Sequence, residues 1–287
     1  MSNLTNAGEN LFVDFMRGQS MALPANLSLG LLSAATDATF TENAWSGYAR
    51  VAVPRTLANW AGTQGGGTII ASAGNSHQTS NNNEISFGNV AAGGSGTINF
   101  VGLFNGTTLI AYAPLVNPIV MAPGDPVAFP PGSIVFTLGL TGGLSDYASN
   151  KLIDMVWRGV AWTWPATSQL RLMTTPPNNS GGGTEVPGTG GYAPRPLSAT
   201  LAFWAGTQGA GTTVVSTGTT GLTSNNAQIV FSPPTANWGT VTHIAISDGL
   251  GGTANLLFWG PMVAGRTIIG GGPAPRYNAA ALTITFA

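Results

Sequence analysis

The sequence predicts a mainly β protein made of two tandem β-sandwich-like domains, each preceded by a short amphipathic α-helix. Three observations favour this fold class. The chain of 287 residues contains 41 glycines and 19 prolines without a collagen-like period. Apolar residues alternate with period two between these turn-forming residues, and one long segment occurs twice.

A repeated tryptophan motif indicates the duplication. Residues 59–68 (NWAGTQGGGT) and 203–212 (FWAGTQGAGT) are identical at eight of ten positions, with an offset of 144. The same offset relates 80–87 to 224–231. Because a match that includes tryptophan and glutamine is not explained by composition, the chain is a tandem duplication. We expect domains at 1–140 and 141–287.

Each copy opens with apolar residues at helical spacing. They are Leu11, Phe12, Phe15 and Met16 in the first copy, and Leu152, Ile153, Val156 and Trp157 in the second. Gly18 and Gly159 are placed to end these helices, and Ser145 with Asp146 can cap the start of the second. We expect each helix to dock on a sheet.

Period-two alternation follows each helix. The clearest examples are Leu27, Leu29 and Leu31, Leu170 and Leu172, and the final segments 133–138 and 281–286. Proline and glycine recur between such segments at intervals of roughly ten residues, as in an all-β sandwich or barrel. The pattern predicts about seven or eight strands per copy.

Charge is scarce: 9 Lys+Arg stand against 10 Asp+Glu, for a net charge of −1. Since nucleic-acid-binding proteins carry clustered basic residues, we expect no nucleic-acid partner. The absence of cysteine excludes disulfides and thiolate zinc sites. It also means that the sequence does not indicate whether the protein works in an oxidising or a reducing compartment. Residues 1–24 lack a secretory signal and no 18 apolar residues run together, so we expect no membrane partner and synthesis in a cytoplasm.

The duplication also serves as an internal control for catalytic groups, because an ancestral site could persist in both copies. His77 lies opposite Gly221, and His243 lies opposite Phe100, so neither histidine is shared. We interpret both as surface or strand residues. Without a histidine-carboxylate cluster or cysteine, the sequence offers no metal ligands.

One charged pair does recur. Asp14 precedes Arg17 by three residues, and Asp154 precedes Arg158 by four, both within the predicted helices. This spacing predicts an intrahelical ion pair worth a few tenths of a kcal/mol rather than a catalytic role.

The remaining candidate catalytic and phosphate-binding residues do not match the patterns that these functions require. Glu84 becomes Gln228 in the second copy, which removes a proton-transfer group. The glycine runs 65–67, 181–183 and 209–211 lack the Gly-Lys-Ser/Thr ending of a phosphate loop and are interpreted as turns. We therefore predict that the protein is not an enzyme, with no catalytic, cofactor-binding or metal-binding residues and no cofactor.

Both copies keep aromatic and amide positions instead. They are Trp60 and Trp204, and the pairs Asn81–Asn82 and Asn225–Asn226. One interpretation makes the tryptophans core residues and the asparagines turns that bond their own backbone. The other makes them a surface that binds sugar or a protein neighbour.

The second copy resembles the small virion proteins of tailed bacteriophages commonly labelled "phage tail fibre protein". The resemblance spans 157–260 and rests on Trp-Arg-Gly at 157–159, Gly-Gly-Tyr-Ala at 190–193, the tryptophan motif, Asn-Trp-Gly-Thr-Val-Thr-His at 237–243, and Asn-Leu-Leu-Phe-Trp-Gly at 255–260. The first copy fits more loosely, and tandem duplication departs from the usual single copy.

The resemblance implies a structural protein of a virion, made in the host cytoplasm. Neither heptads nor a short β-repeat predicts a long shaft. Two modules that contact two neighbours instead favour a capsid decoration (cement) protein that clamps neighbouring major capsid subunits on the capsid surface. Its expected partners are the major capsid protein and copies of itself, with a trimer as the family-style expectation. The alternative is a tail fibre or tail-tip component involved in host attachment.

Overall fold

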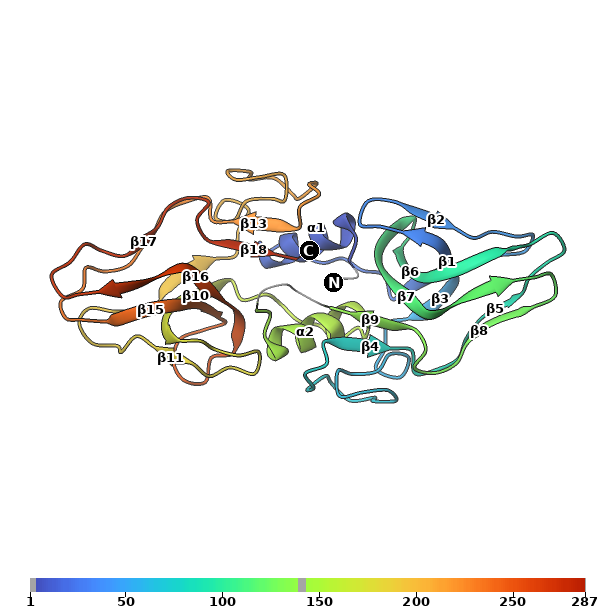
Figure 1. The fold of residues 1–287 in the computed structure, drawn as a ribbon, viewed down its shortest axis with the longest axis horizontal. Coiled ribbons are helices and arrows are strands. Elements are labelled where there is room, and N and C mark those ends of the chain that lie inside the picture. The colour runs from blue at the N-terminus through green and yellow to red at the C-terminus, as the bar shows by residue number, and fades with distance from the viewer. Residues whose placement is uncertain (1–3, 139–142, 287) are drawn as a thin grey trace. The chain divides into compact units, whose positions relative to one another are not determined.

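A computed structural model describes residues 4–138 and 143–286 (Figure 1). Strands dominate it and recur in the same order in the two halves, which confirms the prediction of a mainly β protein with tandem similar halves. The described residues contain nine strands in each half rather than seven or eight. The difference lies in very short strands such as β11, whose two residues are too few to show alternation.

The elements of the first half are α1 Asn6–Met16, β1 Asn26–Ala35, β2 Phe40–Glu42, β3 Val51–Pro54, β4 Gln78–Ser80, β5 Ile85–Asn89, β6 Gly96–Asn105, β7 Thr108–Met121, β8 Pro126–Phe129 and β9 Val135–Thr137. Those of the second are α2 Asp146–Val156, β10 Thr167–Thr175, β11 Thr184–Glu185, β12 Arg195–Ser198, β13 Leu222–Ser224, β14 Ile229–Val230, β15 Gly239–Ser247, β16 Leu256–Ile268, β17 Arg276–Tyr277 and β18 Thr283–Thr285.

Each half contains one five-stranded sheet and two two-stranded ribbons. The first sheet runs β2-β1-β6-β7 with β3 also paired to β1, and the second runs β11-β10-β15-β16 with β12 paired to β10. The ribbons are β4-β9 and β5-β8, matched by β13-β18 and β14-β17. All pairs are antiparallel, so register places alternate side chains on one buried face.

The predicted alternation is confirmed where it is strongest. Leu27, Leu29 and Leu31 on β1 are buried, as are Leu170 and Leu172 on β10. These leucines share one face of each sheet because side chains two apart point the same way. The β1 and β10 strands therefore form the centre of each core.

The second helix begins at its predicted cap, and both helices are followed by the predicted glycines. Ser145 accepts a hydrogen bond from the Ala148 backbone amide at 3.1 Å, which caps α2. Gly18 and Gly159 follow the helices with φ of 80° and 67°. A Cβ at Gly159 would lie 2.3 Å from the Arg55 carbonyl oxygen, so both conformation and close approach require glycine there.

The chain forms two compact units that exchange parts of their helices. Unit 1 comprises Met1–Glu9, Ala22–Gly139 and Asn150–Trp162, and unit 2 comprises Asn10–Met21, Leu140–Ser149 and Thr163–Ala287. Most of each helix thus belongs to the unit built from the other copy's strands. The predicted boundary at 140/141 lies outside the described residues.

Ring contacts within each unit show this exchange. In unit 2, the Phe12 and Phe286 ring centroids are 5.9 Å apart, so the apolar stripe of α1 faces the end of the second copy. In unit 1, the Trp157 and Phe136 centroids are 5.7 Å apart. Figure 1 accordingly draws α1 beside β13 and β18, and α2 beside β4 and β9. The helices are amphipathic as predicted, but each docks on the other copy.

Candidate functional site

Two equivalent arginines are buried at the helix ends. Arg17 is 0% exposed and Arg158 is 2% exposed, and both stand just beyond the last residue of a helix. A buried guanidinium is costly unless its donors are satisfied. Their partners therefore show what these arginines hold in place.

In unit 2, Arg17 binds the loop that follows the second tryptophan motif. Its Nε donates to the Trp204 carbonyl at 2.9 Å, and Nη2 donates to the Thr212 carbonyl at 3.3 Å. Nη1 binds Asp14 at 2.7 Å and Ser216 Oγ at 3.2 Å. The predicted Asp14–Arg17 ion pair is confirmed, but it is part of a network that reaches across the sequence.

Unit 1 repeats this network with different residues. Arg158 Nε donates to the Trp60 carbonyl at 3.0 Å and Nη2 to the Thr68 carbonyl at 3.2 Å. Nη1 pairs with Asp154, whose second oxygen accepts the Ser72 amide at 2.8 Å. The expectation of a few tenths of a kcal/mol applies to an exposed pair, whereas the Arg158–Asp154 pair is buried, so removing one partner alone should cost about 3–5 kcal/mol.

The shared tryptophans and first asparagines are interior residues. Trp60 and Trp204 are buried, as are Asn81 and Asn225. The Asn81 amide nitrogen donates to the Asn83 and Pro130 carbonyls at 2.9 and 2.8 Å. The structure therefore favours core tryptophans and backbone-bonded asparagines over a sugar-binding surface made of the same residues.

The second asparagine and the motif glutamine brace the loop itself. In unit 1, Asn82 Oδ1 accepts the Gly67 amide at 2.9 Å, and Gln64 Nε2 donates to the Ala71 carbonyl at 2.8 Å. Asn226 and Gln208 make the same bonds in unit 2, to Gly211 and Val215, at 2.9 and 2.7 Å. The repeated motif thus encodes a rigid loop.

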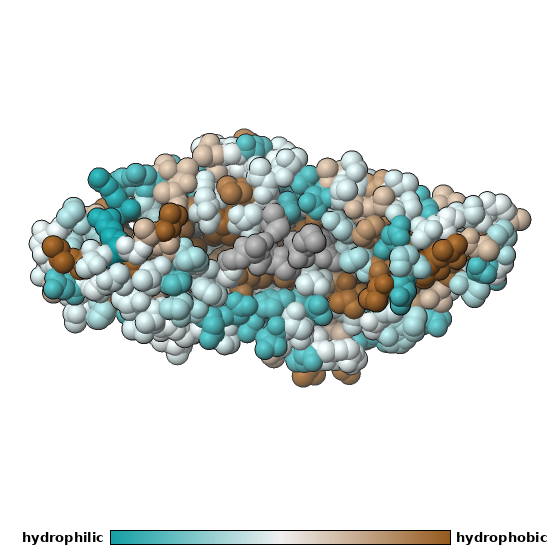
Figure 2. Space-filling model, viewed as in Figure 1, coloured by the Kyte–Doolittle hydropathy of each residue, from teal (hydrophilic) through white to brown (hydrophobic). Residues whose placement is uncertain are grey.

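These loops end in exposed apolar residues, which we call the loop tips: Ile69–Ile70 in unit 1 and Val214–Val215 in unit 2. Ile70 is 66% exposed and Val214, at the same motif position, is 60% exposed. Apolar residues appear in Figure 2 as separate brown groups between pale and teal ones. A braced loop with a β-branched apolar end suits contact with another protein, since little order is lost on binding.

The long hairpin of each half carries a second shared exposed feature. Pairing of β6 with β7 jumps from Ile98–Ile119 to Phe100–Pro114, and pairing of β15 with β16 jumps in the same way, so the second strand bulges. Val116 lies in the first bulge and is 95% exposed, and Val263 lies fully exposed in the second. Bulges that aim side chains outward are typical of functional edges.

Each unit contains a tyrosine-glutamate-arginine cluster beside its five-stranded sheet, but the arginine comes from a different sequence position in each. In unit 1, Tyr48 donates to Glu42 at 2.8 Å, and Arg50 pairs with Glu42 at 2.7 Å. Burial tends to raise the pKa of Glu42, but hydrogen bonds from Arg50 and Tyr48 outweigh it and hold the pKa below its ordinary value.

In unit 2, Tyr192 binds Glu185 at 2.7 Å, but the arginine is Arg171 of β10. Arg171 corresponds to Gly30 of the first copy. Since the arginine moved between copies, sequence alignment of the two halves could not reveal this cluster.

The residues considered for catalysis do not assemble into a site. His77 precedes β4, His243 lies on β15 beside Thr242, and Glu84 and its counterpart Gln228 are exposed. The three glycine runs lie in turns or loops with exposed residues. Within 4–138 and 143–286, no group of three His, Cys, Asp or Glu side chains could hold a metal ion. No helix in the described part of the chain has the length and apolar character needed to cross a membrane.

Comparison with known families gives a decisive match. The model of the podophage GP4 fiber I protein gp80 family matches residues 3–137 and again 143–285. The chain belongs to this family. It contains two copies of the family's unit, which confirms the resemblance to phage fibre proteins and the tandem duplication. The protein is a structural protein of a phage virion.

The gp80-family match also includes the first copy, whose motifs resemble those of phage fibre proteins only loosely. Its match covers 3–137, nearly the whole copy. A search of curated proteins finds no match.

Proposed function

We propose that this protein is a fibre component of the virion and that its two loop tips bind neighbouring fibre subunits, including copies of itself. The family match carries this proposal, because its description is that of a fibre protein and it applies to each copy separately. Two copies in one chain provide two attachment points, and linked contacts raise avidity without a larger single interface.

The chemistry of the loops supports a protein partner. Segments 62–76 and 206–220 contain no charged residue, and their tips expose Ile69–Ile70 and Val214–Val215. The cores of protein interfaces are depleted of charge in the same way. The partner surface is therefore expected to be apolar and uncharged where it meets the tips.

Capsid decoration is the second candidate. The sequence contains no heptads and no short β-repeat that would build a shaft, and a clamp on neighbouring major capsid subunits would use the same two tips. Gold-labelled antibody on intact virions separates the two. Label at the tail is expected for a fibre component, whereas label spread over the head would replace the fibre proposal with capsid decoration.

The loop tips can be tested directly. Ile70→Asp together with Val214→Asp places two charges in the proposed contacts, so we expect the variant to be lost from assembled virions while its melting temperature stays within about 2 °C of the parent. Ser86→Asp, at an exposed position of β5, is the matched control and should assemble normally. Normal incorporation of the double variant would contradict a role for the tips.

A further inference from the structure

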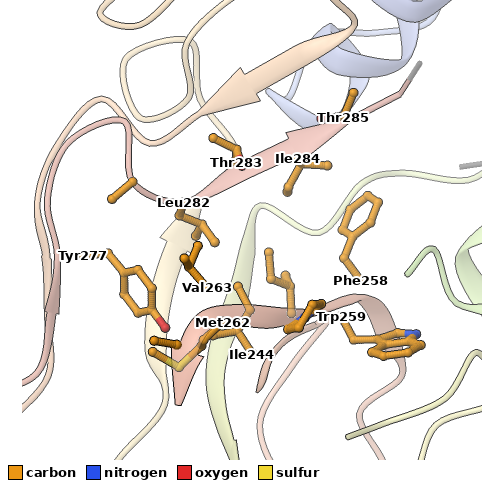
Figure 3. A pocket seen from close by; sticks show the side chains of 15 residues that line it. Ile244, Phe258, Trp259, Met262, Val263, Tyr277, Leu282, Thr283, Ile284 and Thr285 are labelled. Carbon is orange, nitrogen blue, oxygen red and sulfur yellow. The ribbon is translucent and has the colours of Figure 1, made fainter. Parts of the chain in front are cut away.

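Unit 2 contains an apolar cavity of about 510 Å³ between β16 and β18 (Figure 3). Its walls include Ile244, Phe258, Met262, Leu282 and Ile284. None of its fifteen lining residues carries a charge. The volume lies in the usual range of small-molecule sites, roughly 300–1,000 Å³.

One polar group in this wall lacks a partner. The Tyr277 hydroxyl is buried and makes no hydrogen bond with any residue in the described ranges. Figure 3 shows it directed toward Met262. Burial raises the pKa of Tyr277 to about 12, with the charge of Arg266 acting in the opposite direction. The hydroxyl is therefore protonated at neutral pH and is available to donate a hydrogen bond, which a buried hydroxyl normally does.

A positive charge lies on the strand that lines the cavity. Arg266 is exposed on β16, just beyond the bulge that lines the cavity, and forms no ion pair within the described parts of the chain. Its charge acts on the Tyr277 hydroxyl. The cavity wall thus contains one donor without a partner, and a cation lies on β16 two residues beyond Ala264, the last lining residue of that strand.

The first copy lacks both polar groups. By strand register, Arg266 opposite Val241 corresponds to Ile119 opposite Ile98. Tyr277, which pairs with Ile229, corresponds likewise to Phe129, which pairs with Ile85. The donor and the cation are therefore confined to the second copy, where the cavity lies. Since the fold is preserved with Ile119 and Phe129, it does not require them.

We propose that this cavity binds an anionic amphiphile, with its apolar chain between β16 and β18 and its head group accepting a hydrogen bond from Tyr277 beside Arg266. A single-chain carboxylate fits this description, because most of the lining side chains are apolar and the two polar groups complement one negative head. The apolar chain supplies affinity and the head supplies orientation. The inference does not depend on the fibre proposal.

Isothermal titration of the full chain with sodium dodecanoate at pH 8, below its micelle concentration, tests the site. We expect saturable binding of one molecule per chain. Tyr277→Phe and Arg266→Gln should each weaken binding about tenfold, since each removes one charge-assisted contact. Arg276→Gln is the matched control. It removes the same charge one residue from Tyr277, where strand geometry points the side chain to the opposite face, and it should leave binding unchanged.

Two further measurements complete the test. Ala281→Trp adds a bulky ring at the cavity wall and should abolish binding with an unchanged melting temperature. Dodecanol, which has the same chain without the charge, should bind more weakly and should not respond to Arg266→Gln. Absence of saturable binding, binding that survives Ala281→Trp, or equal affinity for dodecanol would overturn the proposal.

Discussion

At the scale of single residues, Arg17 and Arg158 connect the sequence motif to the fold. Each donates from a buried position to the carbonyl of a motif tryptophan and to the loop beyond it. The planar guanidinium supplies five fixed donors, which lysine cannot reproduce. The motif is therefore kept in both copies by its fit to an arginine, in addition to its own packing.

Removing this arginine should be costly. Arg158→Met leaves Asp154 buried without its cation and removes the Arg158 donor from the Trp60 carbonyl, so we expect unit 1 to lose about 3–5 kcal/mol of unfolding free energy. Urea denaturation followed by tryptophan fluorescence measures this loss. Arg276→Met, on an exposed arginine, should cost less than about 0.5 kcal/mol. Equal losses for both variants would contradict the anchoring role.

Glu9 predicts a pH dependence confined to unit 1. Burial, with help from the charge of Asp37, raises the pKa of Glu9 to about 7. Because the folded state holds this proton more tightly than the unfolded state, Glu9 lowers stability as pH rises from about 4.5 to 7. Glu9→Gln cannot ionise, so at pH 8 its unfolding free energy should exceed that of the parent by about 1 kcal/mol and its melting temperature should be higher. At pH 4 the variant and the parent should melt at the same temperature.

Thermal melting at the two pH values provides the check. The second copy supplies a natural control, since Ser149 stands at the position equivalent to Glu9. Ser149→Ala should change stability by the same amount at both pH values. A Glu9→Gln effect that is independent of pH would show that the carboxyl does not titrate between folded and unfolded states.

The ion pairs illustrate how far sequence reasoning reaches at this scale. The spacing of Asp14 to Arg17 is enough to predict their pairing, because helix geometry is local. Burial of Arg17 depends on a loop nearly 200 residues away, to which it is bonded at Ser216. Local spacing carries no information about such partners. The moved arginines Arg50 and Arg171 escape prediction for a related reason, since only the three-dimensional position is shared.

At the scale of elements, helix ends and braced loops fix where the exchanged segments lie. The stripes, caps and closing glycines predict both helices from sequence because each signal is local. The short ribbons are not predicted in number, since strands of two or three residues pair through contacts far along the chain. Comparison of the two sequence copies locates the loop tips, but it does not predict that their side chains are exposed.

The helix-closing glycine gives a sharp test at this scale. Gly159→Ala forces a positive φ on alanine and brings its Cβ to 2.3 Å from the Arg55 carbonyl oxygen, so we expect a loss of about 2–3 kcal/mol in unit 1. Gly66→Ala is the matched control in an open loop, with no atom within 4 Å of the added Cβ. It should be neutral in the same denaturation experiment. A neutral Gly159→Ala would contradict the close packing of this turn.

At the scale of the whole molecule, duplication and helix exchange make one chain from two interdependent units. Unit 1 takes Asn150–Trp162 from the second copy, and unit 2 takes Asn10–Met21 from the first. The two sequence copies show where the repeat lies. They do not show whether a helix packs on its own copy or on the other one, because both arrangements bury the same apolar stripe. The scarcity of charge, 7% of residues, is consistent with a protein whose role is structural.

Helix exchange, the central structural claim, is tested most directly by comparing two fragments that share an N-terminus. Residues 1–162 contain all of unit 1, whereas residues 1–140 lack its segment Asn150–Trp162 with Trp157 and Arg158. Differential scanning calorimetry of both should show a cooperative unfolding transition for 1–162 and none for 1–140. A cooperative transition of equal temperature in 1–140 would contradict the exchange and would place each helix with its own copy.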